Sequence, residues 1–177
     1  HSEGLSFDTI VASGENSSKP HAVPTDRRIQ ENDVITIDMG CKINGYCSDM
    51  TRTIFVGKVP DEIKPVYDLV LKNQEQVLQD MKDNANTKQI SKMVDNDFRL
   101  NNYDLIHALG HGVGLDIHEG PVLSINSESV LRENMVVTDE PGIYVAGQFG
   151  VRIEDTVLIT KGGCEPLTKS PKRYIVI

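Results

Sequence analysis

Residues 35–53 read ITIDMGCKINGYCSDMTRT, an apolar and β-branched stretch interrupted by an Asn-Gly dipeptide at 44–45. Asn-Gly between two alternating runs is the strongest short-range signal for a β-hairpin, because a type I′ turn needs positive φ at both central residues. With this dipeptide at the tip, Gly40 faces Asp49, and Asp38 points to the same side as Asp49. The stretch therefore predicts a hairpin in which the two carboxylates are diagonal neighbours, roughly 7–8 Å apart at the backbone.

The two predicted neighbours, Asp38 and Asp49, carry like charges. Such a pair destabilises a hairpin unless something cationic lies between them. The nearest cation along the ribbon is Arg52, so a surface network of aspartates and arginine is one interpretation. A bound metal ion is the other, and the acids and histidines elsewhere in the chain bear on the choice.

Composition restricts the class of protein. The chain has 177 residues, 38% of them hydrophobic, and no long apolar run, so we expect one domain with a substantial core and no membrane-spanning segment. A net charge of −8 argues against nucleic-acid or anionic-membrane partners and suits a binder of cations. Three cysteines without a C-x-x-C pair predict a reducing, cytoplasmic location and no thiolate metal site. In the predicted register Cys41 and Cys47 lie on opposite faces, so no disulfide is expected between them.

The order of apolar patterns predicts an α+β fold. Alternating segments indicate strands, and apolar residues at helical spacing indicate two helices. The expected elements are a strand over 5–12, a hairpin over 34–56, helices over 60–81 and 87–98, and strands over 135–145 and 150–160 joined by AGQFG. Strand pair, helices and strand pair suggest two similar halves.

Three of the five histidines lie in residues 106–121, IHALGHGVGLDIHEGP. A lone histidine is usually structural, but His107, His111 and His118 are set among closely spaced glycines that disfavour a helix and allow close approach of a ligand. The spacing is not the H-E-x-x-H of a helical zinc protease. These histidines are therefore expected on strands or loops, and they indicate a site.

Two further acids lie in apolar surroundings near the C-terminal end. Glu140 ends a predicted strand at a Pro-Gly break, and Glu154 lies within VRIEDTVLI. A buried carboxylate is costly unless it is paired or binds a metal. Arg152 shares a face with Glu154, so an ion pair is the alternative to a metal site here.

Four carboxylates and one imidazole together suit a divalent transition metal. The candidate ligands are Asp38, Asp49, His111, Glu140 and Glu154. Oxygen ligands with a single imidazole fit Mn²⁺, Fe²⁺, Co²⁺ or Zn²⁺, and five ligands of this charge are too many for one ion. Two ions about 3.5–4 Å apart, bridged by carboxylates, are the arrangement of dinuclear hydrolases.

Six segments in this order resemble the pita-bread metallopeptidases. They are SGENSSKPHAVPTDR, VITIDMG, YCSDMTRT, GHGVGLDIHEGP, TDEPGIY and GVRIEDTVLIT. The resemblance runs from about Ser6 to the C-terminus and is strongest to Xaa-Pro aminopeptidases and Xaa-Pro dipeptidases (prolidases), with methionine aminopeptidases more distant. It implies a curved antiparallel sheet with covering helices and pseudo-twofold halves.

The resemblance also implies a role for each metal ligand. Asp38 would chelate one ion, and His111 and Glu140 the other. Asp49 and Glu154 would bridge both. A hydroxide held between two divalent ions, Mn²⁺ by first choice and Co²⁺, Zn²⁺ or Fe²⁺ as alternatives, would attack the scissile carbonyl. Glu140 would shuttle its proton as general base and then as general acid.

Four more residues take roles from the same resemblance. His118 would stabilise the developing oxyanion, and His21 would lie beside the leaving side of the peptide bond. His107 and Arg152 match positions near the proline-binding side. The expected activity is hydrolysis of the bond before proline, in peptides with proline at the second position.

The resemblance leaves some questions open. It does not separate an aminopeptidase from a dipeptidase, and it does not fix the metal. Relatives carry helices and an N-terminal domain before the first matching strand, so residues 1–177 are expected to be a single catalytic domain and a fragment of a longer, homodimeric protein. A catalytically silent peptide- or protein-binding module of the same fold is the alternative; it would take up one ion or none.

Overall fold

The structure is a computed structural model that describes residues 2–177, and it contains two long helices and several short sheets. The helices are α1 (Lys64–Asp80) and α2 (Thr87–Leu100), with a 3-10 helix, η1 (Gly14–Ser18). The strands are β1 (Gly4–Leu5), β2 (Ile10–Ser13), β3 (Val34–Met39), β4 (Cys41–Ile43), β5 (Tyr46–Cys47), β6 (Met50–Phe55), β7 (Gly110–Gly112), β8 (Glu119–Leu123), β9 (Val136–Asp139), β10 (Gly142–Val145), β11 (Phe149–Arg152), β12 (Asp155–Ile159), β13 (Cys164–Pro166) and β14 (Ile175–Val176). The predicted α+β class is confirmed.

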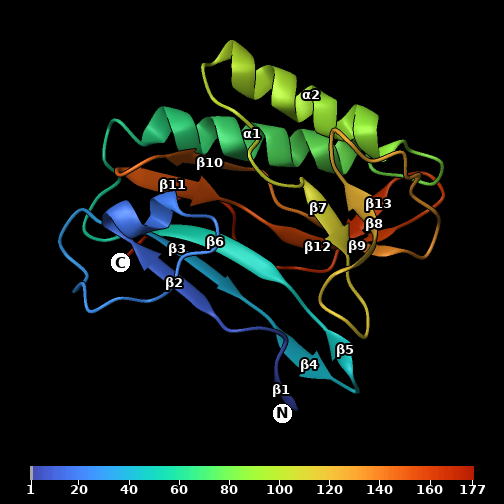
Figure 1. The fold of residues 1–177 in the computed structure, drawn as a ribbon, viewed down its shortest axis with the longest axis horizontal. Coiled ribbons are helices and arrows are strands. Elements are labelled where there is room, and N and C mark those ends of the chain that lie inside the picture. Colours follow the sequence, from blue (N-terminus) through green and yellow to red (C-terminus); the bar gives the residue numbers. More distant parts are fainter. Residues whose placement is uncertain (1) are drawn as a thin grey trace.

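The two helices lie side by side on one side of the sheets (Figure 1). Both were predicted, and only their ends differ. The first begins at Lys64 instead of Pro60, because residues 61–63 form a turn and Pro65 occupies the first helical turn, where its missing N–H costs nothing. The second begins after Asn86, whose side chain accepts a hydrogen bond from the Gln89 N–H and caps the helix. No helix among residues 2–177 is long and apolar enough to cross a membrane.

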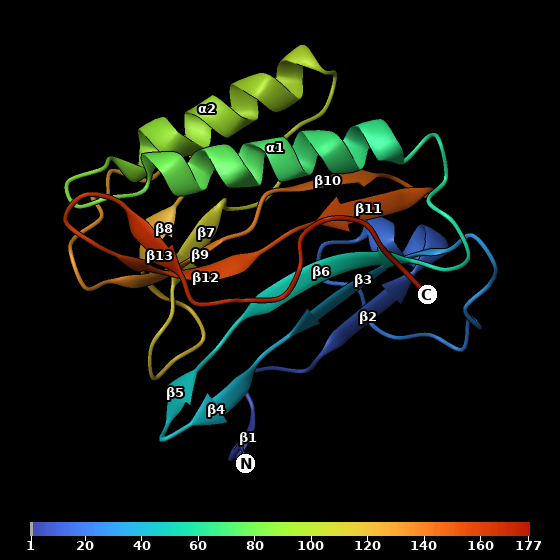
Figure 2. The ribbon, with the colours of Figure 1, turned by 180° about the vertical axis from the view of Figure 1, so that it is seen from behind.

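Two main sheets carry the site. Their strand orders are β14-β6-β3-β2 and β13-β12-β9-β7-β8, and two smaller sheets are ordered β1-β4-β5 and β10-β11. The strands pair antiparallel, as expected, except that β14 runs parallel to β6. Figure 2 shows the C-terminal segment returning along that strand. The backbone N–H of Ile177 donates to the Phe55 carbonyl, which fixes this tail to the sheet edge.

The hairpin at residues 34–55 has the predicted register. Asn44 and Gly45 both have positive φ, 53° and 80°, as a type I′ turn requires. Ile43 pairs with Tyr46 at the tip, and Asp38 pairs with Thr51 further along. Asp38 and the residue two before Thr51, which is Asp49, are therefore diagonal neighbours. The turn chemistry alone was sufficient to predict this arrangement.

The predicted strands 135–145 and 150–160 are each interrupted, which corrects the expectation of two continuous strands. The breaks fall between β9 and β10 and between β11 and β12. The pairs Asp139–Asp155 and Gly142–Arg152 keep one register across the gap, so Glu140 and Glu154 lie opposite each other within it. The predicted strand 5–12 is likewise divided, into β1 and β2.

The gap forms because the backbone N–H groups of Glu140 and Glu154 bond to other segments of the chain. The Glu140 N–H donates to the Leu109 carbonyl at 2.9 Å, and the Glu154 N–H donates to the Thr51 carbonyl at 3.1 Å. Each glutamate is thus bonded to a neighbouring segment instead of to its partner strand. The two strands separate at this point, and Glu140 and Glu154 do not form a hydrogen-bonded ladder pair.

The core lies between the helices and the sheets that they cover. The helices bury Val66, Val70 and Val77 of α1 and Val94 and Phe98 of α2. On the sheet side the fully buried apolar residues include Val137, Ile143, Val151, Val157 and Ile159. Each such side chain contributes about 1.5–3 kcal/mol by burial. The helices thus pack against β8, β9, β10 and β11.

Candidate active site

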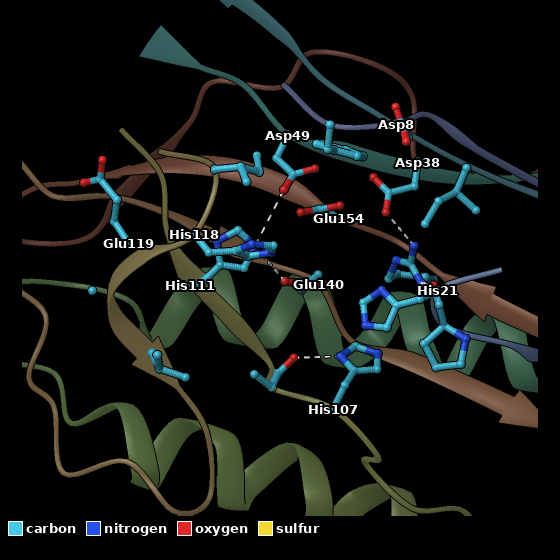
Figure 3. A pocket seen from close by; sticks show the side chains of 18 residues that line it. Asp8, His21, Asp38, Asp49, His107, His111, His118, Glu119, Glu140 and Glu154 are labelled. Atoms are coloured by element: carbon cyan, nitrogen blue, oxygen red, sulfur yellow. Dashed lines mark hydrogen bonds and ion pairs between the residues drawn. The ribbon is translucent and has the colours of Figure 1, made fainter. Parts of the chain in front are cut away.

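One cavity of about 600 Å³ lies between the hairpin at residues 34–55 and the paired strands β9 to β12. Every site residue predicted from the sequence lines it. The predicted residues that line it are His21, Asp38, Asp49, His107, His111, His118, Glu140, Arg152 and Glu154. They come from β3, β7 and β11 and from the loops and strand breaks next to them. Figure 3 shows Asp49, Glu140 and Glu154 converging with His111 near its centre.

The centre of the cavity has the spacing of a metal site. One ligand atom from each of Asp49, His111 and Glu154 lies within 4.8 Å of the other two. The Nε2 atom of His111 is 3.6 Å from Asp49 Oδ2 and 3.3 Å from Glu140 Oε1. The other ring nitrogen, Nδ1, is 3.0 Å from the Gly112 carbonyl oxygen, so it carries the proton. The lone pair of Nε2 therefore points at the carboxylates, as a metal ligand requires.

Two buried oxygens at this centre have no partner. Asp38 Oδ1 and Asp49 Oδ1 make no hydrogen bond to any described residue. Buried polar atoms are nearly always satisfied, because an unpaired one costs about 1–3 kcal/mol. A divalent cation between these carboxylates would satisfy both atoms. The donor set of carboxylate oxygens with one imidazole thus fits the metals that the sequence suggested.

The electrostatics of the acids support the same fit. Burial, together with the nearby charges of Asp38 and Glu140, raises the pKa of Asp49 to about 8. Burial raises the pKa of Glu140 to about 7 and holds that of Glu154 well above its ordinary value. Without a cation, desolvation and mutual repulsion disfavour the charged forms of these carboxyls. Burial also lowers the pKa of His111, which keeps its imidazole neutral and able to bind a metal.

Arg152 is buried beside the acids and connects the hairpin at residues 34–55 with the paired strands β10 and β11. Its Nη2 donates to Asp38 Oδ2 at 2.7 Å, its Nη1 to the Tyr144 hydroxyl at 2.6 Å, and its Nε to Thr51 Oγ1 at 3.0 Å. The expected ion pair with Glu154 is not formed, so that interpretation is wrong. The strand break separates the two residues, and Glu154 instead accepts a hydrogen bond from Thr51 Oγ1 at 2.7 Å.

Arg52 does not lie between the two hairpin aspartates. Its Nη2 is 2.7 Å from Asp155 Oδ1, and Lys172 Nζ is 3.0 Å from the other oxygen of that aspartate. Arg52 points to the face of β6 opposite Thr51, because successive side chains alternate across a strand. The interpretation of Asp38, Asp49 and Arg52 as a surface network is therefore wrong, and the cation that pairs with Asp38 is Arg152.

Two of the remaining histidines line the cavity wall, where His107 is half-buried and His118 is exposed. Burial lowers the pKa of His107 to about 4, and its Nε2 lies 3.0 Å from the Tyr144 hydroxyl. Burial also lowers the pKa of His118, whose ring lies edge-on to that of His111 with centroids 4.5 Å apart. His21 is exposed at the rim of the cavity.

Tyr144 was missed in the sequence. Its hydroxyl accepts from Arg152 and is the hydrogen-bond neighbour of His107, so it fixes both side chains on one wall of the cavity. The signal that could have found it is the segment TDEPGIY, which ends on this tyrosine. Thr51 was missed as well, and only the pairing of distant segments reveals its contact with Glu154.

A family model for metallopeptidase family M24 matches residues 1–161. The chain belongs to metallopeptidase family M24. It is 44% identical over 176 residues to the Xaa-Pro dipeptidase of Pyrococcus furiosus, covering 98% of this chain and 50% of that protein. It is 45% identical over 175 residues to the Xaa-Pro dipeptidase of Pyrococcus horikoshii, again with 98% and 50% covered.

Solved structures of M24 relatives confirm the pita-bread fold. The X-Pro aminopeptidase of Thermotoga maritima superimposes with a TM-score of 0.96 at 43% identity, covering 99% of this chain and 51% of that one. The prolidase of Pyrococcus furiosus gives 0.94 at 44% identity, with 97% and 51% covered. The chain thus spans about half the length of the relatives it matches.

Proposed function

We propose that this M24 peptidase is a dinuclear exopeptidase that hydrolyses the peptide bond before proline. The observation that carries the proposal is the cavity in which carboxylates and a neutral imidazole converge beside a wall that includes His107 and Arg152. Relatives named prolidase and X-Pro aminopeptidase support the proline specificity. They leave both an aminopeptidase and a dipeptidase open. A cytoplasmic location and a homodimer remain predictions.

The ions would be held at the centre of the cavity. The proposed ligands are Asp38, Asp49, His111, Glu140 and Glu154. When bound, two divalent ions supply a hydroxide nucleophile near neutral pH and polarise the scissile carbonyl. We take Mn²⁺ as the first choice, although the donor set also suits Co²⁺, Fe²⁺ and Zn²⁺.

Proton transfer falls to Glu140. Its side chain is half-buried and lines the cavity, its pKa is raised to about 7 in the metal-free chain, and Oε1 accepts a hydrogen bond from Thr138 Oγ1 at 3.1 Å. A carboxyl held in one orientation can take a proton from the nucleophile and then give it to the leaving nitrogen. The nitrogen of proline has no hydrogen in the peptide, so this delivery is needed before the product can leave.

The oxygen of the scissile carbonyl would face His118. His118 is neutral because burial lowers its pKa, and its ring packs edge-on against the ligand His111. A neutral imidazole N–H aimed at the oxygen stabilises the charge that develops there, which is commonly worth about 2.7–4 kcal/mol. The edge-on contact fixes the ring beside the metal centre without making it a ligand.

His107 and Arg152 line the wall that would hold the proline residue, and both bond Tyr144, which does not line the cavity itself. Tyr144 links the other two side chains through its hydroxyl, so the wall is rigid. His107 is half-buried and neutral and would therefore offer an uncharged ring face to the pyrrolidine ring. His21, at the rim, would contact the leaving side of the bond.

A substrate panel tests the proposal. The protein, loaded with Mn²⁺, is given Xaa-Pro dipeptides and Xaa-Pro-Yaa tripeptides, with Xaa-Ala peptides of the same lengths as controls. We expect cleavage only before proline, and the cleaved length separates dipeptidase from aminopeptidase. Equal cleavage of Xaa-Ala peptides would contradict proline specificity. Peptide binding without any cleavage would favour the silent binding module.

A further inference from the structure

We propose that Asp8 selects peptides whose first residue carries a positive charge, namely Lys or Arg. The inference rests on the proposed function, because it concerns the residue on the amino side of the same bond. Asp8 lies in the irregular segment between β1 and β2, and it lines the catalytic cavity together with Phe7 and Ile10. None of the metal or proton-transfer roles described above uses it.

The Asp8 carboxylate is available to a ligand. It is exposed, and within residues 2–177 it forms neither a side-chain hydrogen bond nor an ion pair. The other acids that line the cavity either have a hydrogen-bond partner or belong to the proposed metal ligands. Asp38 is paired with Arg152, and Glu119 accepts the Asp116 N–H at 2.9 Å and is turned away from the labelled acids (Figure 3).

The position of Asp8 fits the side chain that precedes the scissile bond. Figure 3 places Asp8 and His107 on opposite sides of Asp38 and Glu140. If the scissile carbonyl lies at these acids and the proline ring lies against His107, the first residue extends toward Asp8. The half-buried Phe7 next to it can cover the alkyl part of a Lys or Arg side chain while the charged end meets the carboxylate.

The charge of the cavity favours the same substrates. Its formal charges come from carboxylates and a single guanidinium: Asp8, Asp38, Asp49, Glu119, Glu140, Glu154 and Arg152. Two divalent ions would compensate the central acids but would leave Asp8 uncompensated at the outer wall. The chain as a whole carries a net charge of −8, which adds to the attraction for cationic peptides.

The test compares substrates that differ in charge and little in length. Lys-Pro, norleucine-Pro and Ala-Pro peptides, of the length that the protein cleaves, are assayed with the wild type, Asp8→Asn and Asp8→Lys. We expect kcat/KM for Lys-Pro to exceed that for norleucine-Pro by about three- to fivefold, the range of a solvent-accessible ion pair. Asp8→Asn should remove this preference, and Asp8→Lys should reverse it. Raising the salt concentration should weaken the preference in the wild type and leave the ratio for Asp8→Asn unchanged.

A matched control separates the local charge from the net charge. Asp26 is exposed and does not line the cavity, so Asp26→Asn makes the same change in net charge and should keep the preference for Lys-Pro. An Asp8→Asn variant with the wild-type ratio of Lys-Pro to norleucine-Pro would overturn the inference. A loss of the preference in Asp26→Asn as well would also overturn it, because the net charge would then be the cause.

A binding arm keeps this inference distinct from the proposed function. Calorimetric titration of the metal-free protein with Lys-Pro and norleucine-Pro measures charge selectivity without hydrolysis. Selective binding that depends on Asp8, with no cleavage of any Xaa-Pro peptide on metal loading, would contradict the proposed function alone. Cleavage of Ala-Pro peptides combined with equal binding of both titrants would contradict the role of Asp8 alone.

Discussion

Replacing Asp49 by asparagine should make the metal-free protein more stable at alkaline pH. Burial and the neighbouring acids raise the pKa of Asp49 from 3.8 to about 8 in the folded chain. The folded state therefore holds a proton on this carboxyl that the unfolded state releases near pH 4. The stability from this proton is fully present below about pH 4 and is lost as the pH rises through about 8.

The size of the effect follows from the shift. About four pKa units, at about 1.4 kcal/mol each, set an upper limit of roughly 6 kcal/mol. Water in the open cavity reduces the burial cost, so we expect Asp49 to account for roughly 2–4 kcal/mol between pH 5 and 8. Asparagine keeps the shape of the side chain and does not titrate. The variant should therefore lose less free energy of unfolding over this range than the wild type does.

Urea unfolding in the presence of a chelator measures the difference. Midpoints and slopes are recorded at pH 5, 6.5 and 8 for the wild type, Asp49→Asn and the exposed control Asp26→Asn. The control should follow the wild type, and the Asp49→Asn curve should be flatter. Parallel curves for wild type and Asp49→Asn would refute the reasoning, because they would mean that this carboxyl is not desolvated among like charges.

Three further predictions concern single side chains. Because Asp49 is proposed to bridge both ions, Asp49→Ala should lose more metal than Asp38→Ala by elemental analysis. If both variants kept two ions per chain, the hairpin acids would not be metal ligands. His118→Ala should lower kcat by roughly 10²–10³ with unchanged metal content; a loss of metal would make His118 a ligand. Tyr144→Phe leaves a buried donor of Arg152 and the acceptor Nε2 of His107 without their partner and should lower the free energy of unfolding by about 1–3 kcal/mol in urea titration. A variant as stable as the wild type would show that water replaces the hydroxyl.

Local turn chemistry explains what could be predicted. The positive φ values of Asn44 and Gly45 determine the hairpin register, and the register alone places Asp38 and Asp49 together. Helical spacing of apolar residues likewise predicted α1 and α2 to within a few residues of their ends. These features depend only on residues close together in the sequence, so they can be predicted without a structure.

Long-range pairing explains what could not be predicted. Arg152 was expected beside Glu154 on one strand, but it pairs with Asp38, 114 residues away. The break that separates Arg152 from Glu154 exists because the Glu154 N–H bonds to the Thr51 carbonyl of another hairpin. No periodicity in residues 150–160 carries that information. The roles of the site residues came from the resemblance to known peptidases, and they remain to be tested.

The number of metal ions bound per chain tests the central claim most directly. The protein is stripped with chelator, dialysed against Mn²⁺ near neutral pH, freed of unbound ions and analysed for metal and protein concentration. The proposed ligand set predicts two ions per chain, since five ligands with four carboxylates carry too much charge for one. One ion per chain, or none, would contradict a dinuclear peptidase and leave the peptide-binding module as the better description.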